Sequence, residues 1–141
     1  MLRSSLPHQL TFAKPVTKNY YAVIIRIVEK DLSLENFQET VSRCFTLIKK
    51  YNGDVNQFLG DIILSLWGVP LCFPTDKEKC NEFFIELKKC NLPVSAILLN
   101  DIGLYGSFGN ETRLTVTAVS NKIFNAVKEL INCSNRTFME M

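Results

Sequence analysis

The segment Asn56–Pro70 constrains the fold of this chain more than any other part of it. It consists of two apolar runs joined by Gly60-Asp61, a pattern that predicts a β-hairpin. A Gly-Asp pair admits the positive φ that tight hairpin turns require. The turn therefore carries one carboxylate at its tip. Asp61 could hold a divalent metal there, or it could be an ordinary turn residue.

The other secondary structure follows from hydrophobic periodicity, capping residues and turn residues. A β-branched and aromatic run predicts a strand at Tyr20–Val28, and Asn100-Asp101 predicts a turn between two strands. The further strands are expected at Val55–Leu59, Ile62–Trp67, Val94–Leu99, Gly103–Phe108 and Leu114–Val119. Helices are expected from a cap at Asp31 or Ser33 to about Tyr51, from Pro74–Lys77 to about Cys90, and from a cap at Ser120 through Ile131.

The order β-α-β-β-α-β-β-β-α predicts an α+β protein, a ferredoxin-like or palm-type sandwich in which helices cover one face of one sheet. Residues 1–19 are expected to be an N-terminal linker and residues 20–141 one domain. With 47% hydrophobic residues, the chain has enough apolar content for a single core.

Charge and cysteine usage exclude several classes of function. A net charge of +2 gives no nucleic-acid signature, and the apolar runs are too short to cross a membrane. The five cysteines are odd in number and form no C-x-x-C pair, and His8 is the single histidine, so a zinc site is not expected. Reduced thiols in a cytoplasmic protein are the expectation.

Two groups of residues resemble one family. The first is the hairpin, whose Leu64–Trp67 strand and Trp67-Gly68-Val69-Pro70 close are similar to the central hairpin of class III nucleotide cyclases, especially the soluble adenylyl cyclases. The second is the pair of segments Gly103–Gly109 and Arg113–Asn121, which resemble the family's glycine-rich hairpin and the segment after it. The resemblance runs from about Tyr20 to about Leu130.

The resemblance implies cyclisation of a nucleoside triphosphate at a dimer interface, with two metal ions holding the phosphates. Three positions agree with it wholly or partly. Asp61 corresponds to the second metal aspartate, and Thr117 to a base-selecting residue that suits adenine. Lys128 stands where the family has a transition-state arginine, so the charge is kept but the bidentate fork is lost.

Three other positions depart from the family's pattern. Ile27 stands at the first metal aspartate and has no oxygen ligand. Gln57 replaces the base-selecting lysine, and Phe124 replaces the asparagine that orients the ribose. The loop after the first strand, Val28–Leu34, is also shorter than the family's phosphate-binding loop. Plain structural roles for Gln57, Thr117, Lys128 and Phe124 compete with these chemical ones.

These departures predict a degenerate cyclase domain, a pseudo-cyclase that dimerises with itself or with another cyclase domain and has little activity alone. One alternative is half of a heterodimeric adenylate cyclase whose partner supplies the missing groups. Another is a non-catalytic nucleotide or small-anion sensor. No cofactor is expected unless a nucleotide such as ATP binds, in which case Mg²⁺ or Mn²⁺ would accompany it. The family's final strands are expected to be absent.

Overall fold

A mixed sheet of six strands with three helices forms the protein in the computed structural model, which describes residues 14–29, 33–109 and 114–141. The strand order is β2-β3-β1-β4-β5, and β6 pairs with β4 in parallel. The strands are β1 (Val16–Ile27), β2 (Asp54–Leu59), β3 (Ile62–Trp67), β4 (Val94–Gly109), β5 (Leu114–Val119) and β6 (Phe138–Glu140). The helices are α2 (Leu34–Lys50), α3 (Asp76–Lys89) and α4 (Asn121–Ile131). The predicted α+β class is confirmed.

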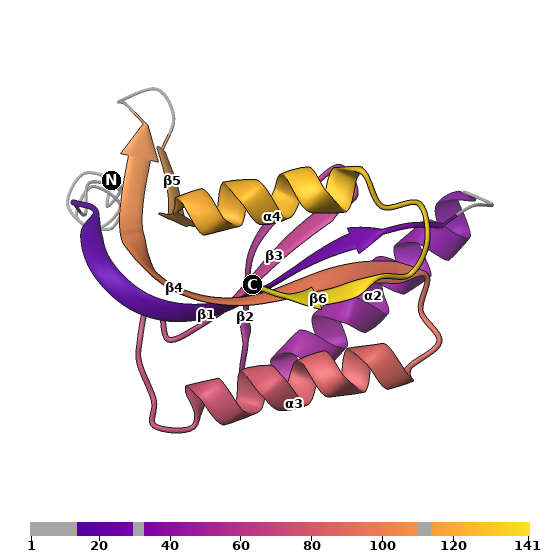
Figure 1. Cartoon of the computed structure of the whole chain (residues 1–141), viewed down its shortest axis with the longest axis horizontal. Coiled ribbons are helices and arrows are strands. Elements are labelled where there is room, and N and C mark those ends of the chain that lie inside the picture. Colours follow the sequence, from indigo (N-terminus) through magenta and orange to yellow (C-terminus); the bar gives the residue numbers. More distant parts are fainter. Residues whose placement is uncertain (1–13, 30–32, 110–113) are drawn as a thin grey trace, which may run out of the picture.

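Helices cover both faces of the sheet, so the prediction that they cover a single face was wrong. Figure 1 shows α4 on one side of the sheet and α2 and α3 on the other. Along β1, Val23 and Ile25 belong to the core cluster with α2 and α3, whereas Ala22 and Ile24 belong to the cluster with α4. The physical reason is that the central strands are apolar on both faces, a pattern that requires cover on both.

The hairpin of β2 and β3 forms as predicted. Leu59 pairs with Ile62, which leaves Gly60 and Asp61 as a two-residue turn, and Gly60 takes a positive φ of 63°. β3 then pairs with β1 along the centre of the sheet, from Tyr21 opposite Trp67 to Arg26 opposite Ile62. This pairing places the hairpin tip beside the C-terminal end of β1.

Side-chain caps begin two of the helices at the predicted residues. Ser33 accepts a hydrogen bond from the Asn36 amide at the start of α2, and Ser120 accepts one from the Ile123 amide at the start of α4. Asp31, the alternative cap for α2, lies outside the described residues, as do His8 and Arg113. The third helix, α3, begins at Asp76, within the predicted range.

The predicted turn at Asn100-Asp101 was wrong, because both residues lie inside the single long strand β4. Asn100 pairs with Tyr21 and Asp101 with Tyr20, so β1 holds the segment extended. Gly103 serves close packing within this strand, because a Cβ there would lie 2.6 Å from the hydroxyl of Tyr20. Tertiary pairing has overridden turn propensity here.

One boundary and one additional strand also differ from the sequence prediction. β1 begins at Val16 rather than Tyr20, because its first residues pair with the second half of β4. The short strand β6 follows α4 and was not predicted. Arg136 and Thr137 lead into it, and the Thr137 amide donates to the Ser95 hydroxyl on β4. A three-residue strand shows too little alternation to be found from sequence.

Substituting Gly53 with alanine should destabilise the fold. The new Cβ would lie 2.6 Å from Cε2 of Trp67 and 2.9 Å from Cγ2 of Ile48, and Trp67 is held by a hydrogen bond to the Tyr51 carbonyl. We expect a loss of about 1–3 kcal/mol in the free energy of unfolding, measured by urea denaturation. Gly60→Ala, which meets no atom within 4 Å but keeps a positive φ, should cost about 1 kcal/mol. Equal stability of Gly53→Ala and the wild type would contradict the packing described.

Candidate functional site

An open groove of about 690 Å³ lies between the hairpin and α4. It brings together three of the residues singled out from the sequence: Gln57 from β2, and Phe124 and Lys128 from α4. Its floor is the sheet surface of β1 and β3. The remaining lining residues are Ile24, Leu59, Ile62, Leu64, Asn121, Ile123, Asn125 and Val127.

The groove is mainly apolar. Seven of its eleven lining residues are hydrocarbon or aromatic side chains, and Lys128 is the one charged residue among them. Two large apolar side chains, one on each wall, face solvent: Leu59 is 81% exposed and Phe124 is 54% exposed. Such a surface suits contact with another apolar surface better than it suits a polyanion.

Asp61 lies at the hairpin tip and is held by β1. Its carbonyl accepts a hydrogen bond from the Ile27 amide at 2.9 Å, and its carboxylate Oδ2 accepts from Arg26 Nε at 3.0 Å. This ion pair is partly buried, with the Arg26 side chain 25% exposed and the Asp61 side chain 44% exposed. The carboxylate is therefore already neutralised by a cation of the same chain.

The same guanidinium also binds the end of α4. Arg26 Nη1 donates to the carbonyls of Leu130, Ile131 and Cys133 at 2.8–2.9 Å. The last carbonyls of a helix have no partner within the helix, and the helix dipole gives that end a partial negative charge. Arg26 therefore binds the carbonyls of Ile131 and Cys133, shares the Leu130 carbonyl with the Cys133 amide, and offsets the dipole at once.

Sequence reasoning missed Arg26. It singled out Ile27, but that side chain is 4% exposed and packs in the core cluster of α2 and α3, on the face of β1 away from the groove. The residue of β1 whose side chain meets Asp61 is Arg26. The available signal was its position as the one charged residue in the apolar run Tyr20–Val28.

The residues present do not fit a divalent metal site. Hard cations need several oxygen ligands, and around Asp61 the partner on the neighbouring strand is a cation instead of a second carboxylate. Within residues 14–29, 33–109 and 114–141, no group of three or more His, Cys, Asp or Glu side chains could hold a metal ion. The site therefore departs from the two-metal chemistry that the resemblance implies.

Thr117 does not line the groove and has a structural partner. Its hydroxyl donates to Oδ1 of Asn56 at 2.7 Å, and Nδ2 of Asn56 donates to the Val116 carbonyl at 3.2 Å. Asn56 lies at the irregularity in the pairing of β2 with β3, between Val55 and Gln57. The two bonds join the edge strands β2 and β5.

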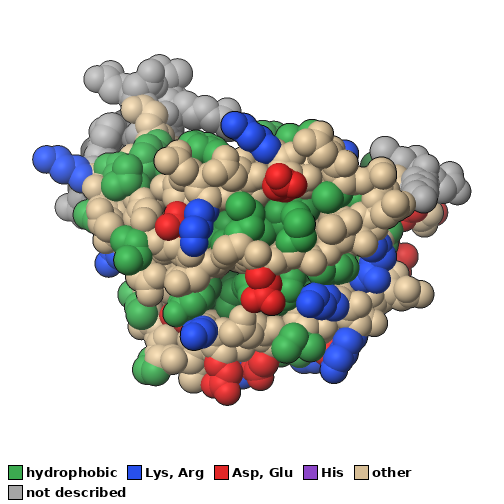
Figure 2. Space-filling view, viewed as in Figure 1, with side chains coloured by type: hydrophobic (Ala, Val, Ile, Leu, Met, Phe, Trp, Pro, Cys, Tyr) green, Lys and Arg blue, Asp and Glu red, His purple; other side chains and the backbone are tan. Residues whose placement is uncertain are grey.

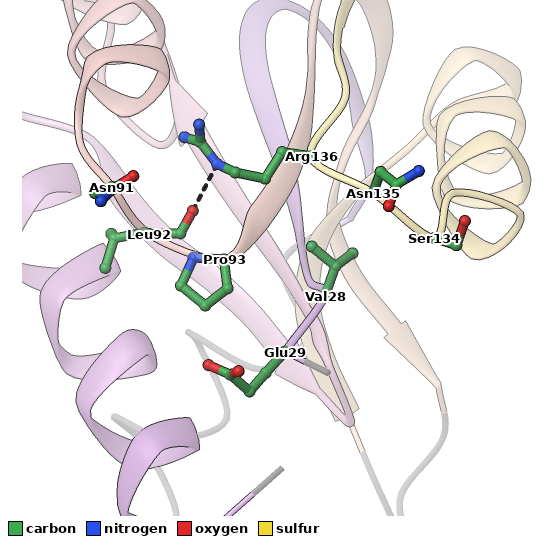
Figure 3. A pocket seen from close by; sticks show the side chains of 8 residues that line it. All are labelled: Val28, Glu29, Asn91, Leu92, Pro93, Ser134, Asn135 and Arg136. Carbon is green, nitrogen blue, oxygen red and sulfur yellow. Dashed lines mark hydrogen bonds between the residues drawn. The ribbon is translucent and has the colours of Figure 1, made fainter. Parts of the chain in front are cut away.

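A second cavity, of about 370 Å³, lies between the start of β4 and the segment that follows α4 (Figure 3). Its most basic residue, Arg136, is engaged by backbone: Nε donates to the Leu92 carbonyl at 2.7 Å, and Nη2 donates to the Cys90 carbonyl at 2.9 Å. Nη2 also reaches the carbonyls of Leu87 and Lys88, at the end of α3. Arg136 thus caps α3 much as Arg26 caps α4.

All five cysteines are free thiols, as predicted. Cys44 and Cys80 are buried in the core. Burial raises the pKa of the Cys44 thiol to about 12, and burial also raises the pKa of the Cys80 thiol. Both therefore stay protonated and unreactive at neutral pH, since the thiolate is the nucleophilic form.

The face of the protein that Figure 2 shows gives no electrostatic sign of a nucleic-acid site among its described residues. Figure 2 shows acidic and basic side chains mixed over the face that carries α4 and α3, instead of one basic patch. Among the described residues, no helix is both long enough and apolar enough to span a membrane.

The fold is that of class III nucleotide cyclase catalytic domains. It is similar to the adenylyl cyclase CyaB from P. aeruginosa, with a TM-score of 0.63 and 15% identity over 84% of this chain and 74% of that one. The guanylyl cyclase Cya2 gives a TM-score of 0.61 and 14% identity, over 90% and 76% of the two chains. No family model and no curated protein matches the sequence.

A third similar structure is described as a non-canonical dimeric guanylyl cyclase domain of the RhoGC fusion protein from the aquatic fungus Blastocladiella emersonii. Its TM-score is 0.62 at 14% identity, over 86% of this chain and 77% of that one. The TM-scores establish a common fold, and at identities this low the chemistry has to be argued from the residues of this chain.

Thr117→Val should lower the free energy of unfolding by about 1 kcal/mol, because the bond to Asn56 is lost. Asn56→Ala combined with Thr117→Val should cost less than the sum of the two single changes, measured by urea denaturation of all four proteins. Thr115→Val is the matched control on the same strand, since the Thr115 hydroxyl makes no hydrogen bond to the described part of the chain. Strict additivity of the two changes would contradict a role for Thr117 in joining β2 to β5.

Proposed function

We propose that this chain is a non-catalytic, cyclase-fold module that pairs through its groove face with a second cyclase-fold domain, either another copy or a different chain. Its role would be to form and regulate such a pair in nucleotide signalling. The fold alone is compatible with an enzyme. The proposal rests on the side chains that the fold presents.

The observation that carries the proposal is the composition of the groove. A nucleoside triphosphate and its transition state need cations and directed donors around several negative charges. The lining supplies one ammonium, Lys128, and places the apolar Phe124 beside it. Burying phosphate charge among hydrocarbon side chains without partners is strongly unfavourable.

The state of Asp61 also supports a non-catalytic role. Its carboxylate is paired with Arg26, so a divalent ion would have to approach a guanidinium bound 3.0 Å from the same oxygen. Positioning and metal-assisted neutralisation are most of what a cyclisation requires. Neither is available from this set of residues.

The exposed apolar side chains support pairing through this face. Leu59 and Phe124 stand on opposite walls of the groove and would leave water on contact with a second surface. The similar structure from Blastocladiella emersonii is described as dimeric. Pairing is therefore the natural use of this face in a chain that lacks the catalytic set.

A second candidate is one half of a heterodimeric adenylate cyclase, favoured by one observation. Lys128 lines the groove and is exposed, so it could contribute charge to a site completed by a partner. The partner would then have to supply the metal carboxylates and the base contacts. A nucleotide sensor would need the groove to bind ATP without turnover.

The purified chain should form no cyclic AMP from ATP with Mn²⁺ or Mg²⁺, because the groove lining has no carboxylate and only one cation, Lys128. Product formation is followed by chromatography, with a competent cyclase as positive control. Turnover abolished by Lys128→Ala would contradict the proposed function. Calorimetry with ATP should show no heat of binding, and binding without turnover would point to the sensing role.

Phe124→Asp should weaken self-association at least tenfold, measured by sedimentation equilibrium, because a charge would replace an apolar contact at the centre of the groove face. Ile85→Asp is the matched control. Ile85 is 50% exposed on α3, on the opposite side of the sheet, so its change should leave association unaltered. A wild-type chain that stays monomeric at millimolar concentration would limit the proposal to pairing with a different chain. Equal effects of the two changes would contradict pairing through the groove face.

A further inference from the structure

Three elements meet at one side chain, Arg26. β1 carries it, the hairpin tip binds it through Asp61, and the end of α4 binds it through three carbonyls. One guanidinium therefore contacts four oxygen atoms at 2.8–3.0 Å. We call this arrangement the Arg26 clamp.

The oxygens of the Arg26 clamp form an environment built for positive charge. The carbonyls of Leu130, Ile131 and Cys133 converge on one nitrogen, at the negative end of the α4 dipole. The Asp61 carboxylate adds a full negative charge beside them. Without a cation the Asp61 carboxylate and these carbonyls would repel one another, and the carbonyls of Ile131 and Cys133 would lose a hydrogen-bond donor.

We propose that Arg26 is a built-in replacement for a metal ion. It permanently holds the hairpin tip, the end of β1 and the end of α4 together, so the groove between the hairpin and α4 keeps its width without any bound ion. This proposal rests on the proposed function in one respect, because it assumes that the chain pairs through that groove. It also gives the carboxylate at the hairpin tip a structural role in a chain that does not fit a metal.

If Arg26 takes the place of a metal ion, the single substitution Arg26→Asp should create a metal site. Arg26 pairs with Ile62, the neighbour of Asp61, on strands about 5 Å apart. The substitution would therefore place a second carboxylate beside Asp61, close to the carbonyls of α4. Carboxylate and carbonyl oxygens are the ligands that hard divalent cations take. The variant should bind Mn²⁺, and the wild type should not.

The first experiment measures the melting temperature and the Mn²⁺ EPR signal of four proteins: wild type, Arg26→Asp, Arg26→Ala and the double variant Arg26→Asp with Asp61→Asn. With 1 mM Mn²⁺, Arg26→Asp should melt about 4 °C higher than without it and bind one ion per chain. The wild type and the double variant should shift by less than about 1 °C. Arg26→Ala controls for loss of the guanidinium alone.

The melting temperatures and the circular dichroism of these variants decide whether the proposal stands. A Mn²⁺ shift in the wild type, or none in a folded Arg26→Asp, would overturn the proposal. If Arg26→Asp is unfolded without metal, recovery of its far-UV circular dichroism on adding Mn²⁺ would support the proposal, and no recovery would overturn it. None of these measurements depends on pairing or on turnover, so they can fail while the proposed function stands, and the reverse is also possible.

The second experiment tests the clamp itself by hydrogen exchange in Arg26→Gln. Exchange should quicken at least tenfold both at the Cys133 amide, which bonds to Leu130, and at the Ile27 amide, which bonds to Asp61. Arg136→Gln is the matched control, because Arg136 also caps a helix, and it should loosen amides at the end of α3 and the start of β4, such as those of Cys90 and Val94, while the Cys133 and Ile27 amides keep their wild-type exchange. Faster exchange at α4 alone in Arg26→Gln would show an ordinary helix cap and overturn the clamp.

Discussion

The central strand β1 is the constraint on which the rest of the structure depends. It pairs with β3 on one side and β4 on the other, and its side chains are buried on both faces. A strand in this position cannot keep a charge in its middle, because burial without partners would cost several kcal/mol, about 2–7 for a polar group. Its two charged residues, Lys18 and Arg26, therefore lie toward its two ends, and at the C-terminal end the hairpin tip and α4 supply the partners of Arg26. The position of Arg26 follows from the burial of β1.

Much of the fold could be predicted because its signals are local. The Gly60-Asp61 turn, the caps at Ser33 and Ser120 and the apolar faces of the helices all depend on neighbours in sequence. The errors lie where distant pairing decides. Asn100 and Asp101 resemble a turn until β1 is placed beside them, and β6 needs β4 as its template. The side of the sheet that α4 covers depends on a crossover connection and not on the helix itself.

The sequence indicated several residues of the candidate site but not how their side chains are arranged. Gln57, Phe124 and Lys128 line one groove, although the residues between them span half the chain. The pairing of Arg26 with Asp61 was missed because a one-residue shift along a strand reverses the face of every side chain. The side chain of Ile27 packs in the core, whereas the side chain of Arg26 binds Asp61 at the hairpin tip. Register, which is a tertiary property, separated the two interpretations.

The bonds from Asn56 to β5 have a consequence for how copies of this chain can meet. β2 and β5 are the end strands of the five-strand path, and an end strand with open backbone groups invites another chain to extend the sheet. Here the irregular pairing at Asn56 turns its amide toward the Val116 carbonyl and the Thr117 hydroxyl. At this point β2 and β5 are hydrogen-bonded to each other through Asn56, much as barrels remove their edges by closing. Strand-to-strand growth is discouraged at this pair of edges, which favours contact through the faces of the sheet over extension of β2 or β5.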